Sequence, residues 1–328
     1  MKKRAHICAG YFKVMKNDCS IVKQGFITGL GKGWSGFLWV LKIFIPISFL
    51  TALMEWGGLI NRLDFLLQPI MGWIHLPPAA ALPIIMGMLV GIYSGIAAMA
   101  VLSFTPDQMT LMAIFMMIAH SLVQEGIIQT KSGLHWAKGT LIRLAAAFAT
   151  TLICAQFLPS TEIPLSNAAA TPSSYTSFLE MLRSWGLATL HLTAIIFGVM
   201  MIILTLLEVL KTLGWIHYVV DFFSPILRLM GLSPRVGFLW ITGAVFGLIY
   251  SSAIIFEEAK EGHLTKEELE ELHLSIGLHH SFVEDPLIFL ALGLGAFWLW
   301  VPRLVAAMVV VRLYTLGQRL MKRSATAG

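Results

Sequence analysis

Long apolar runs alternate with short polar stretches along the chain. In the first half, the runs cover 37–60, 80–104, 109–130 and 139–158. In the second half, they cover 187–211, 214–230, 236–256, 272–298 and 299–316. A helix that crosses a bilayer needs about 20 apolar residues. The pattern therefore predicts an all-α, polytopic integral membrane protein.

The composition supports this class and excludes others. Hydrophobic residues make up 57% of the chain and charged residues 12%, with a mean hydropathy of +0.78. Soluble domains usually carry about 25% charged residues. A soluble enzyme, a nucleic-acid-binding domain and a disordered protein are therefore excluded. The three cysteines, Cys8, Cys19 and Cys154, form no C-x-x-C pair and support neither a disulfide framework nor a zinc knuckle.

The two halves of the chain are similar to each other. At an offset of 156, Gly87 meets Gly243 and Gly91 meets Gly247. At an offset of 160, HSLVQE meets HSFVED, and ten of 28 positions are identical between 120–147 and 280–307. The matches include His, Ser and Arg, which compositional bias toward leucine does not produce. The sequence therefore predicts two homologous repeats with broken or re-entrant helices.

The charge pattern favours inverted repeats. If each half makes three full crossings and the HSxVxE segment re-enters from one side, 18 of the 23 Lys and Arg residues fall on the side of both termini. Basic flanks mark the cytoplasmic side of a membrane. We therefore expect an inner-membrane protein with cytoplasmic termini and the acidic stretch 257–271 outside. Four parallel crossings per half would also produce the repeat.

We expect five segments along the chain. They are a basic N-terminal interfacial segment at 1–34, a first membrane repeat at 35–158, a periplasmic linker at 159–184, a second membrane repeat at 185–316 and a basic cytoplasmic tail at 317–328. The linker is rich in Pro, Ser, Thr and Ala, which marks it as the midpoint. The N-terminal segment alternates apolar and basic groups, so it either lies along the membrane surface or forms a mobile tail.

The repeated polar motif supplies the main candidate site residues. Ionisable groups at bilayer depth are costly and are functional hypotheses by default. The candidates are His120, Ser121, Gln124 and Glu125 in the first half, and His280, Ser281, Glu284 and Asp285 in the second. Residues four apart share a helix face, so His120 is expected beside Gln124, and His280 beside Glu284. The alternative is that these groups bond each other and only hold the halves together.

Helix breaks and small residues accompany the motif. Gly126 and Pro286 follow it at equivalent positions, and both loosen or break a helix. Freed backbone groups at membrane depth are tolerated only when buried in protein or around a cavity. The glycines four apart favour close helix packing. The adjacent pairs Tyr93-Ser94 and Tyr250-Ser251 are candidates for lining the same cavity. Arg143 and Arg303 align and either hold carboxylates or snorkel.

Imidazole and carboxylate groups together suggest a cation. His120, Glu125, His280 and Asp285 are candidates to bind the substrate, a coupling proton or a divalent metal ion. No cofactor is expected beyond such an ion. The chain contains no H-E-x-x-H, no G-x-S-x-G and no P-loop, so it is not expected to be an enzyme or to be powered by a nucleotide.

At this point the motifs resemble a known family. The GxxxGxYSG-like and HSxVEDxxxF segments are similar to those of the Gate, or nucleoside-recognition, membrane proteins. The likeness covers about 35–158 and 185–316. That group includes the membrane part of B-type ferrous-iron transporters and the spore-maturation membrane proteins. The resemblance implies inverted repeats with a central site. This chain departs from the iron transporters, since it has neither a GTPase domain nor a cysteine in its GxxxG segments.

We therefore expect a secondary-type transporter of a small polar or ionic solute, with a divalent metal ion slightly favoured over an organic solute. Its partners are expected to be the lipid bilayer, the solute or ion, and another copy or a membrane partner, but no nucleic acid. One alternative is a non-transporting component similar to the spore-maturation proteins, which acts with a partner protein that docks on 257–271. A nucleoside-type organic solute is the other alternative.

Overall fold

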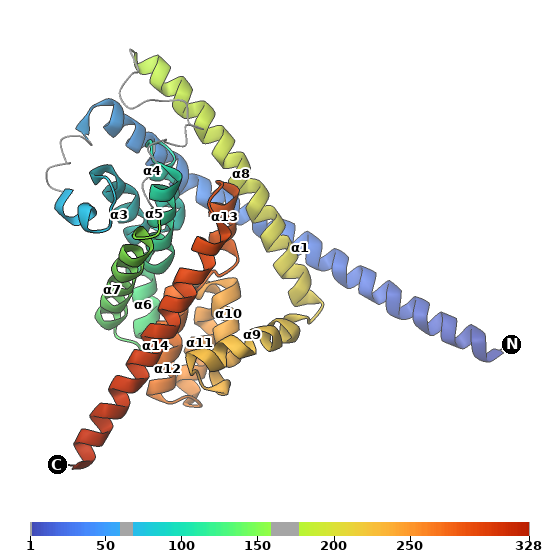
Figure 1. Ribbon diagram of the computed structural model, residues 1–328. Helices are drawn as coiled ribbons and strands as arrows, with labels where there is room; N and C mark the ends of the chain where they lie inside the picture. The colour runs from blue at the N-terminus through green and yellow to red at the C-terminus, as the bar shows by residue number, and fades with distance from the viewer. Residues whose placement is uncertain (1, 60–67, 159–176, 328) are drawn as a thin grey trace.

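The structure is a computed structural model that describes residues 2–59, 68–158 and 177–327. The described residues form helices and no strands, which confirms the all-α prediction. The labelled helices are α1 (Lys2–Trp56), η1 (Pro78–Ala80), α3 (Ala81–Leu89), α4 (Ile92–Met99), α5 (Pro106–Ala119), α6 (Leu122–Lys131), α7 (Trp136–Ala155), α8 (Phe178–Thr212), α9 (Ile216–Met230), η2 (Pro234–Val236), α10 (Gly237–Phe246), α11 (Leu248–Glu261), α12 (Lys266–His279), α13 (Glu284–Ala291) and α14 (Ala296–Ala327) (Figure 1).

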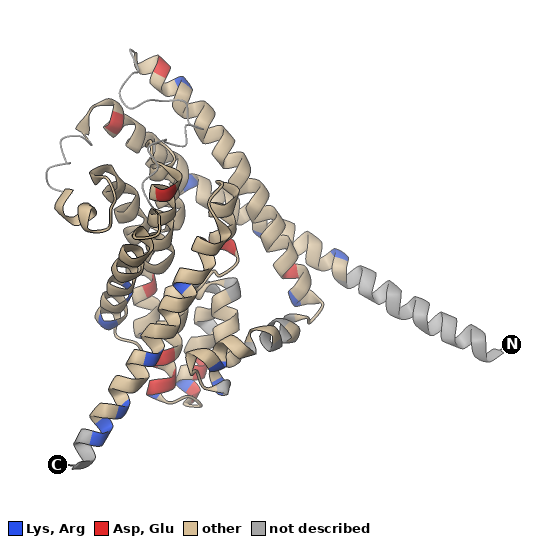
Figure 2. Ribbon diagram, viewed as in Figure 1, with Lys and Arg blue, Asp and Glu red and all other residues tan. Residues whose placement is uncertain are grey.

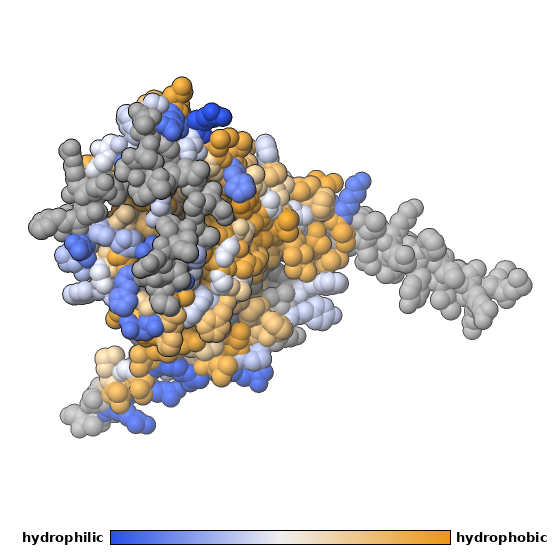
Figure 3. Space-filling model, turned by 45° about the horizontal axis from the view of Figure 1, so that its top comes forward, coloured by the Kyte–Doolittle hydropathy of each residue, from blue (hydrophilic) through white to orange (hydrophobic). Residues whose placement is uncertain are grey.

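Five segments of the described chain are long and apolar enough to cross a membrane. They are Val22–Trp56, Pro106–Lys131, Trp136–Ala155, Phe178–Thr212 and Ala296–Arg323. Large apolar side chains on α8 and α14 are exposed, and Figure 3 shows apolar side chains over much of the visible face. An apolar surface of this extent is typical of contact with lipid. The chain is therefore a multi-pass membrane protein.

The two longest helices pack against each other in opposite directions. Trp56 of α1 lies beside Phe178 of α8, with ring centroids 5.6 Å apart, and Lys32 Nζ lies 2.7 Å from Glu208 Oε2 at the other end of the contact. Small residues bring the backbones together, since a Cβ at Gly29 would lie 2.5 Å from Thr205 Cα. The helix α1 runs through the predicted boundary at residue 34 and packs on α8 on both sides of it, so an interfacial segment ending there stays a prediction.

The core helices α5 and α12 point toward each other. Both begin with a capping box, from Thr105 and Gln108 in α5 and from Thr265 and Glu268 in α12. The pKa of Glu268 is lowered chiefly because its carboxylate accepts the backbone N–H of Thr265. Most side chains of both helices are buried, as expected of helices at the centre of a bundle. Their C-terminal ends therefore meet at the middle of the molecule.

Helix breaks occur at this same middle level, but not where the sequence predicted them. Gly91, at φ 142°, separates α3 from α4, and Gly247, at φ 84°, separates α10 from α11. These glycines therefore break helices, because their backbone conformation is one that L side chains rarely adopt. Gly126 lies inside α6, and Pro286 lies in the first turn of α13, where proline is tolerated because no helical N–H bond is lost.

The re-entrant elements are also different from those predicted. The segments α3–α4 and α10–α11 form helical hairpins whose breaks lie at the centre, because a Cβ at Gly91 would contact Ser121 Oγ at 3.1 Å and one at Gly247 would contact Ser281 Oγ at 3.0 Å. The HSxVxE segments instead continue through the centre, as α5–α6 and α12–α13, in opposite directions (Figure 1). Corresponding elements thus follow one order in each half. That the halves are inverted repeats within a membrane stays a prediction.

The acidic residues of α12 and the basic residues of α14 lie at the same end of the molecule, although the sequence predicted them on opposite sides of the membrane. Lys322 of α14 donates to Glu267 of α12 at 3.0 Å, and Lys138 of α7 donates to Glu270 at 2.9 Å. Figure 2 shows the acidic start of α12 beside the basic end of α14. The expectation that 257–271 lies opposite the C-terminus is therefore wrong, because α12 approaches the centre from the end where α14 finishes.

Two further helices run across predicted segment boundaries. The helix α8 begins at Phe178, where Ser177 Oγ accepts the N–H of Glu180 at 3.2 Å, so 178–184 are helical and not linker. The rest of the predicted linker, 159–176, lies outside the described residues. The helix α14 continues to Ala327 without a boundary at residue 316.

Candidate functional site

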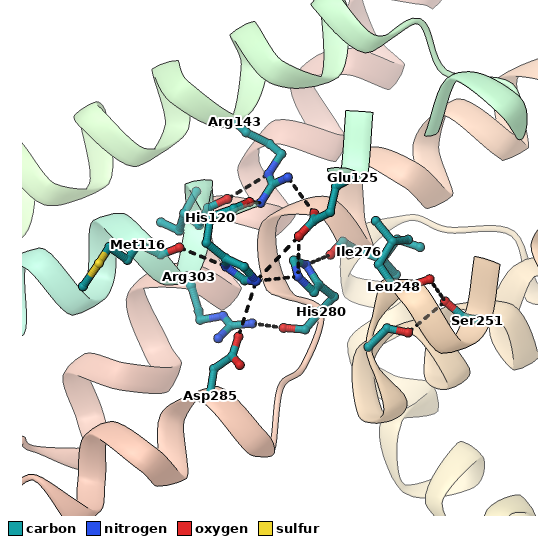
Figure 4. A network of polar contacts seen from close by, with 12 residues as sticks. Met116, His120, Glu125, Arg143, Leu248, Ser251, Ile276, His280, Asp285 and Arg303 are labelled. Atoms are coloured by element: carbon teal, nitrogen blue, oxygen red, sulfur yellow. Dashed lines mark hydrogen bonds and ion pairs between the residues drawn. The ribbon is translucent and has the colours of Figure 1, made fainter. Parts of the chain in front are cut away.

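Two histidines meet where α5 and α12 end. His120 and His280 are the C-cap residues, and their extended backbones turn the chain out of each helix. Each Nδ1 lies 3.0 Å from a carbonyl oxygen four residues earlier, Met116 O for His120 and Ile276 O for His280. The two Nε2 atoms lie 3.0 Å apart (Figure 4). Both rings are buried.

The backbone contacts determine which nitrogen carries the proton. A carbonyl oxygen only accepts hydrogen bonds, so each Nδ1 carries a proton. When the rings are neutral, each Nε2 has a lone pair, and the two lone pairs face each other at hydrogen-bond distance. Two acceptors in this position repel unless a proton or another cation lies between them.

Two carboxylates complete an acceptor-only group. Glu125 Oε1 lies 3.0 Å from His280 Nε2 and 3.6 Å from His120 Nε2. Asp285 Oδ2 lies 3.9 Å from His120 Nε2. We call His120, Glu125, His280 and Asp285 the central cluster. All four residues are buried, and three of them, His120, Glu125 and His280, have ligand atoms close enough to share one metal ion.

A buried arginine from each half supports the cluster. Arg143 of α7 donates to Ile118 O at 2.9 Å, to His120 O at 2.8 Å and to Glu125 Oε2 at 2.6 Å. Arg303 of α14 donates to His280 O. These bonds satisfy carbonyls that the ends of α5 and α12 leave without helical partners. The two guanidinium groups also place positive charge beside the carboxyl groups of Glu125 and Asp285.

The two halves differ in the arginine–carboxylate pair. Arg143 is paired with Glu125, whereas Arg303 Nε, Arg303 Nη1 and Asp285 Oδ2 are buried without a hydrogen-bond partner among the described residues. Aspartate is one methylene shorter than glutamate, which accounts for the missing pair. Asp285 Oδ2 is therefore free to bind a ligand, while Glu125 offers one oxygen to its arginine and the other to the histidines.

The serines of the motif support the backbone. Ser121 and Ser281 both have φ of 49°, a left-handed conformation, and they occupy the breaks after α5 and α12. The N–H of Ser121 donates to Gly87 O at 3.0 Å, which ties this break to the α3–α4 hairpin. Both serines were predicted to bind the substrate. In the structure they lie at the helix breaks beside the central cluster.

The other predicted residues are distributed around the cluster. Ser94 Oγ donates to Met86 O at 2.7 Å, and Ser251 Oγ donates to Gly247 O at 3.1 Å, so both serines bond the backbone of the hairpin breaks. Gln124 is exposed and does not lie beside His120, because the helix ends between them. The side chain of Tyr250 lies outside the described residues.

Tyr93 and Glu284 connect the cluster to a cleft. Tyr93 Oη donates to Glu284 Oε1 at 2.5 Å, and Glu284 precedes Asp285 in α13. Glu284 also lines an open cleft of about 590 Å³ between α1 and α8. Its other lining residues include Thr28, Lys32, Ser35 and Glu208. The sequence did not predict this cleft, because its walls come from helices far apart in the chain.

The comparisons with known proteins agree with the resemblance found in the sequence. Residues 37–133 match the family model described as "Gate: Nucleoside recognition", which confirms the resemblance for that part of the chain. YvoD, described as an uncharacterized membrane protein of Bacillus subtilis (strain 168), is 24% identical over 295 residues, which cover 88% of this chain and 93% of YvoD. No solved structure matches the chain.

Proposed function

We propose that this protein is a transporter that binds a small cation at the central cluster between its two halves, with a divalent metal ion as the favoured substrate. The observation that carries the proposal is the pair of Nε2 lone pairs 3.0 Å apart beside Glu125 Oε1. Each of these atoms only accepts, and burial removes the water that would otherwise donate to them. A bound cation relieves the repulsion that this arrangement creates.

The ligand types support a divalent metal ion. Two imidazoles and one or two carboxylates suit zinc and neighbouring transition metals. Two nitrogens at about 2.1 Å from a tetrahedral ion would be roughly 3.4 Å apart. The separation of 3.0 Å between the Nε2 atoms is close to this value, so small ring rotations accommodate an ion. A proton shared between the two rings is the other occupant that the geometry accepts.

The surroundings support transport rather than a permanently closed structural site. The cluster lies at the breaks of four helical segments, and Asp285 Oδ2 has no fixed partner. Interrupted helices at the centre of a bundle are typical of transporter binding sites. The cleft that reaches Glu284 gives an approach to the cluster from the side of α1 and α8.

Metal binding and flux with the purified chain test the proposal. We expect calorimetric titration with Zn²⁺ and Mn²⁺ to give one buried site, and proteoliposomes to accumulate the ion. His280→Ala removes one ligand and should abolish both. A matched control is His263→Ala, which removes the histidine of a second group, Glu258, Glu261 and His263 near the end of α11, whose side-chain atoms are also close enough to share a metal ion.

The outcomes distinguish the alternatives. Binding and flux that survive His280→Ala but not His263→Ala would contradict the central site. Binding without flux in proteoliposomes, together with a stoichiometric co-purifying protein, would favour the non-transporting component. Flux of nucleosides without metal binding would favour the organic solute.

A further inference from the structure

The helices α6 and α12 share a buried polar contact that extends away from the central cluster. They run antiparallel in register, so Glu125 meets His280, Gln129 meets Gly277 and Ser132 meets His273. The contacts are 3.0 Å between Glu125 Oε1 and His280 Nε2, 2.9 Å between Gln129 Nε2 and a Cβ built on Gly277, and 3.1 Å between His273 Nε2 and Ser132 O. We call Gln129, Ser132 and His273 the polar seam.

The seam contains polar atoms that the protein leaves unsatisfied. Gln129, Ser132 and His273 are 1%, 1% and 0% exposed. Gln129 Nε2 and His273 Nδ1 have no hydrogen-bond partner among the described residues. Because His273 Nε2 donates to Ser132 O, its Nδ1 is an acceptor, while the Gln129 amide is a donor. Water that accepts from Gln129 Nε2 or donates to His273 Nδ1 would satisfy these atoms, and buried water commonly bonds to otherwise unsatisfied polar groups.

The equivalent contact in the other half is apolar. At the repeat offset of 160, Gln129 corresponds to Phe289, Gly277 to Met117 and His273 to Ala113. These three counterparts are 0% exposed and belong to the hydrophobic core. Both contacts begin at the His120–His280 pair, but they extend toward opposite ends of the molecule, because α5 and α12 point in opposite directions. The three residues at the equivalent contact therefore offer no side-chain partners for water.

The polar seam ends at a charged group near the surface. Glu270 lies one turn before His273 on the same face of α12 and accepts from Lys138 Nζ at 2.9 Å. Tyr314 of α14 donates to the same carboxylate. The side chain of Lys138 is about one-third exposed. Buried polar groups thus continue from the central cluster to solvent at the end where α14 finishes.

We propose that the polar seam binds water and is the route by which the central cluster exchanges water and small hydrated cations with the Lys138–Glu270 end of the molecule. The opposite contact, through Met117 and Phe289, stays dry. The seam's role as a cation route rests on the proposed function, whereas its hydration is independent of it.

Hydroxyl-radical labelling of the unaltered chain tests the hydration directly. Radicals made from water by X-rays oxidise side chains that contact water, and mass spectrometry locates the products. We expect His273 to be oxidised although it is buried, and Met117 and Phe289 to be protected although methionine is readily oxidised. Protection of His273, or equal labelling of Met117, would overturn the proposal.

A kinetic experiment tests the route. Gln129→Leu makes the seam apolar without touching a cluster residue, and Phe289→Leu is the matched control at the equivalent position. We expect Gln129→Leu to slow Zn²⁺ association in stopped flow by about tenfold while the Kd from calorimetry stays near that of the unaltered chain. An unchanged rate would overturn the route. If the unaltered chain binds no Zn²⁺, the proposed function fails, and the labelling of His273 still decides whether the seam holds water.

Discussion

The Nη2 of Arg143 donates to the backbone carbonyl of His120 at 2.8 Å, and Arg303 makes the same bond to His280. In both halves the arginine follows the histidine by 23 residues and comes from the next long helix. The bond fixes the carbonyl at the end of a helix, and the histidine's own Nδ1 is fixed one turn earlier. Each ring is thereby held at both its backbone and its side chain, and the two Nε2 atoms face each other.

The two arginines should differ in their contribution to stability. Arg143→Met leaves Glu125 buried without its partner, which typically costs about 3–5 kcal/mol. Arg303→Met loses one bond to His280 O but also removes two unpartnered N–H groups, so we expect a cost of about 1–2 kcal/mol. Thermal unfolding in detergent measures both. Arg183→Met on the exposed face of α8 is the control. Equal losses for Arg143 and Arg303 would show that the unpartnered atoms have partners in solution.

Substitutions of the two cluster carboxylates should differ in their effects on cation affinity and on stability. Asp285→Asn removes a ligand oxygen that has no partner, so we expect cation affinity to fall at least about tenfold while stability changes by less than about 1 kcal/mol. Glu125→Gln should lower both, because the ion pair with Arg143 is lost. Calorimetry and thermal unfolding of the same samples make the comparison. Unchanged affinity in Asp285→Asn would remove this residue from the site.

The α1–α8 contact should be sensitive to a single methyl group. A Cβ at Gly29 would lie 2.5 Å from Thr205 Cα, whereas a Cβ at Gly31 meets nothing within 4 Å. Gly29→Ala should therefore destabilise the protein by about 1–3 kcal/mol through overpacking. Gly31→Ala, two residues away on the same helix, should be neutral or stabilise by up to about 1 kcal/mol. Thermal unfolding checks the pair, and a loss of stability in both would point to local helix effects instead.

Much of the fold was predictable because the chain repeats rare residues at fixed spacing. The match of HSLVQE with HSFVED predicted that His120, Glu125, His280 and Asp285 belong to one central site, and the structure brings these four side chains together. The apolar runs predicted the helices, but not which pairs form hairpins. That depends on Gly91 and Gly247, whose positive φ is invisible in a spacing that also suits helix packing.

Other parts of the site depend on contacts that spacing does not reveal. Gln124 shares the motif but is exposed, because α5 ends before His120 and a new helix begins at Leu122. The polar seam arises from the antiparallel register of α6 on α12, so Ser132 and His273 meet across 141 positions of sequence. The acidic start of α12 lies beside the end of α14 because α12 runs from that end of the molecule to the centre. The sequence predicted that α12 starts on the opposite side, because it treated the HSxVxE segments as re-entrant and not as crossing the centre.

The hairpin breaks at Gly91 and Gly247 have a mechanical consequence. Each hairpin places its break against the serine that follows the histidine helix of its own half. The backbone at each break has no continuous helical hydrogen bonding, so bending there would break fewer hydrogen bonds than bending inside a helix. A tilt of either hairpin about its break would therefore act on the backbone next to His120 or His280 while the helices themselves stay intact.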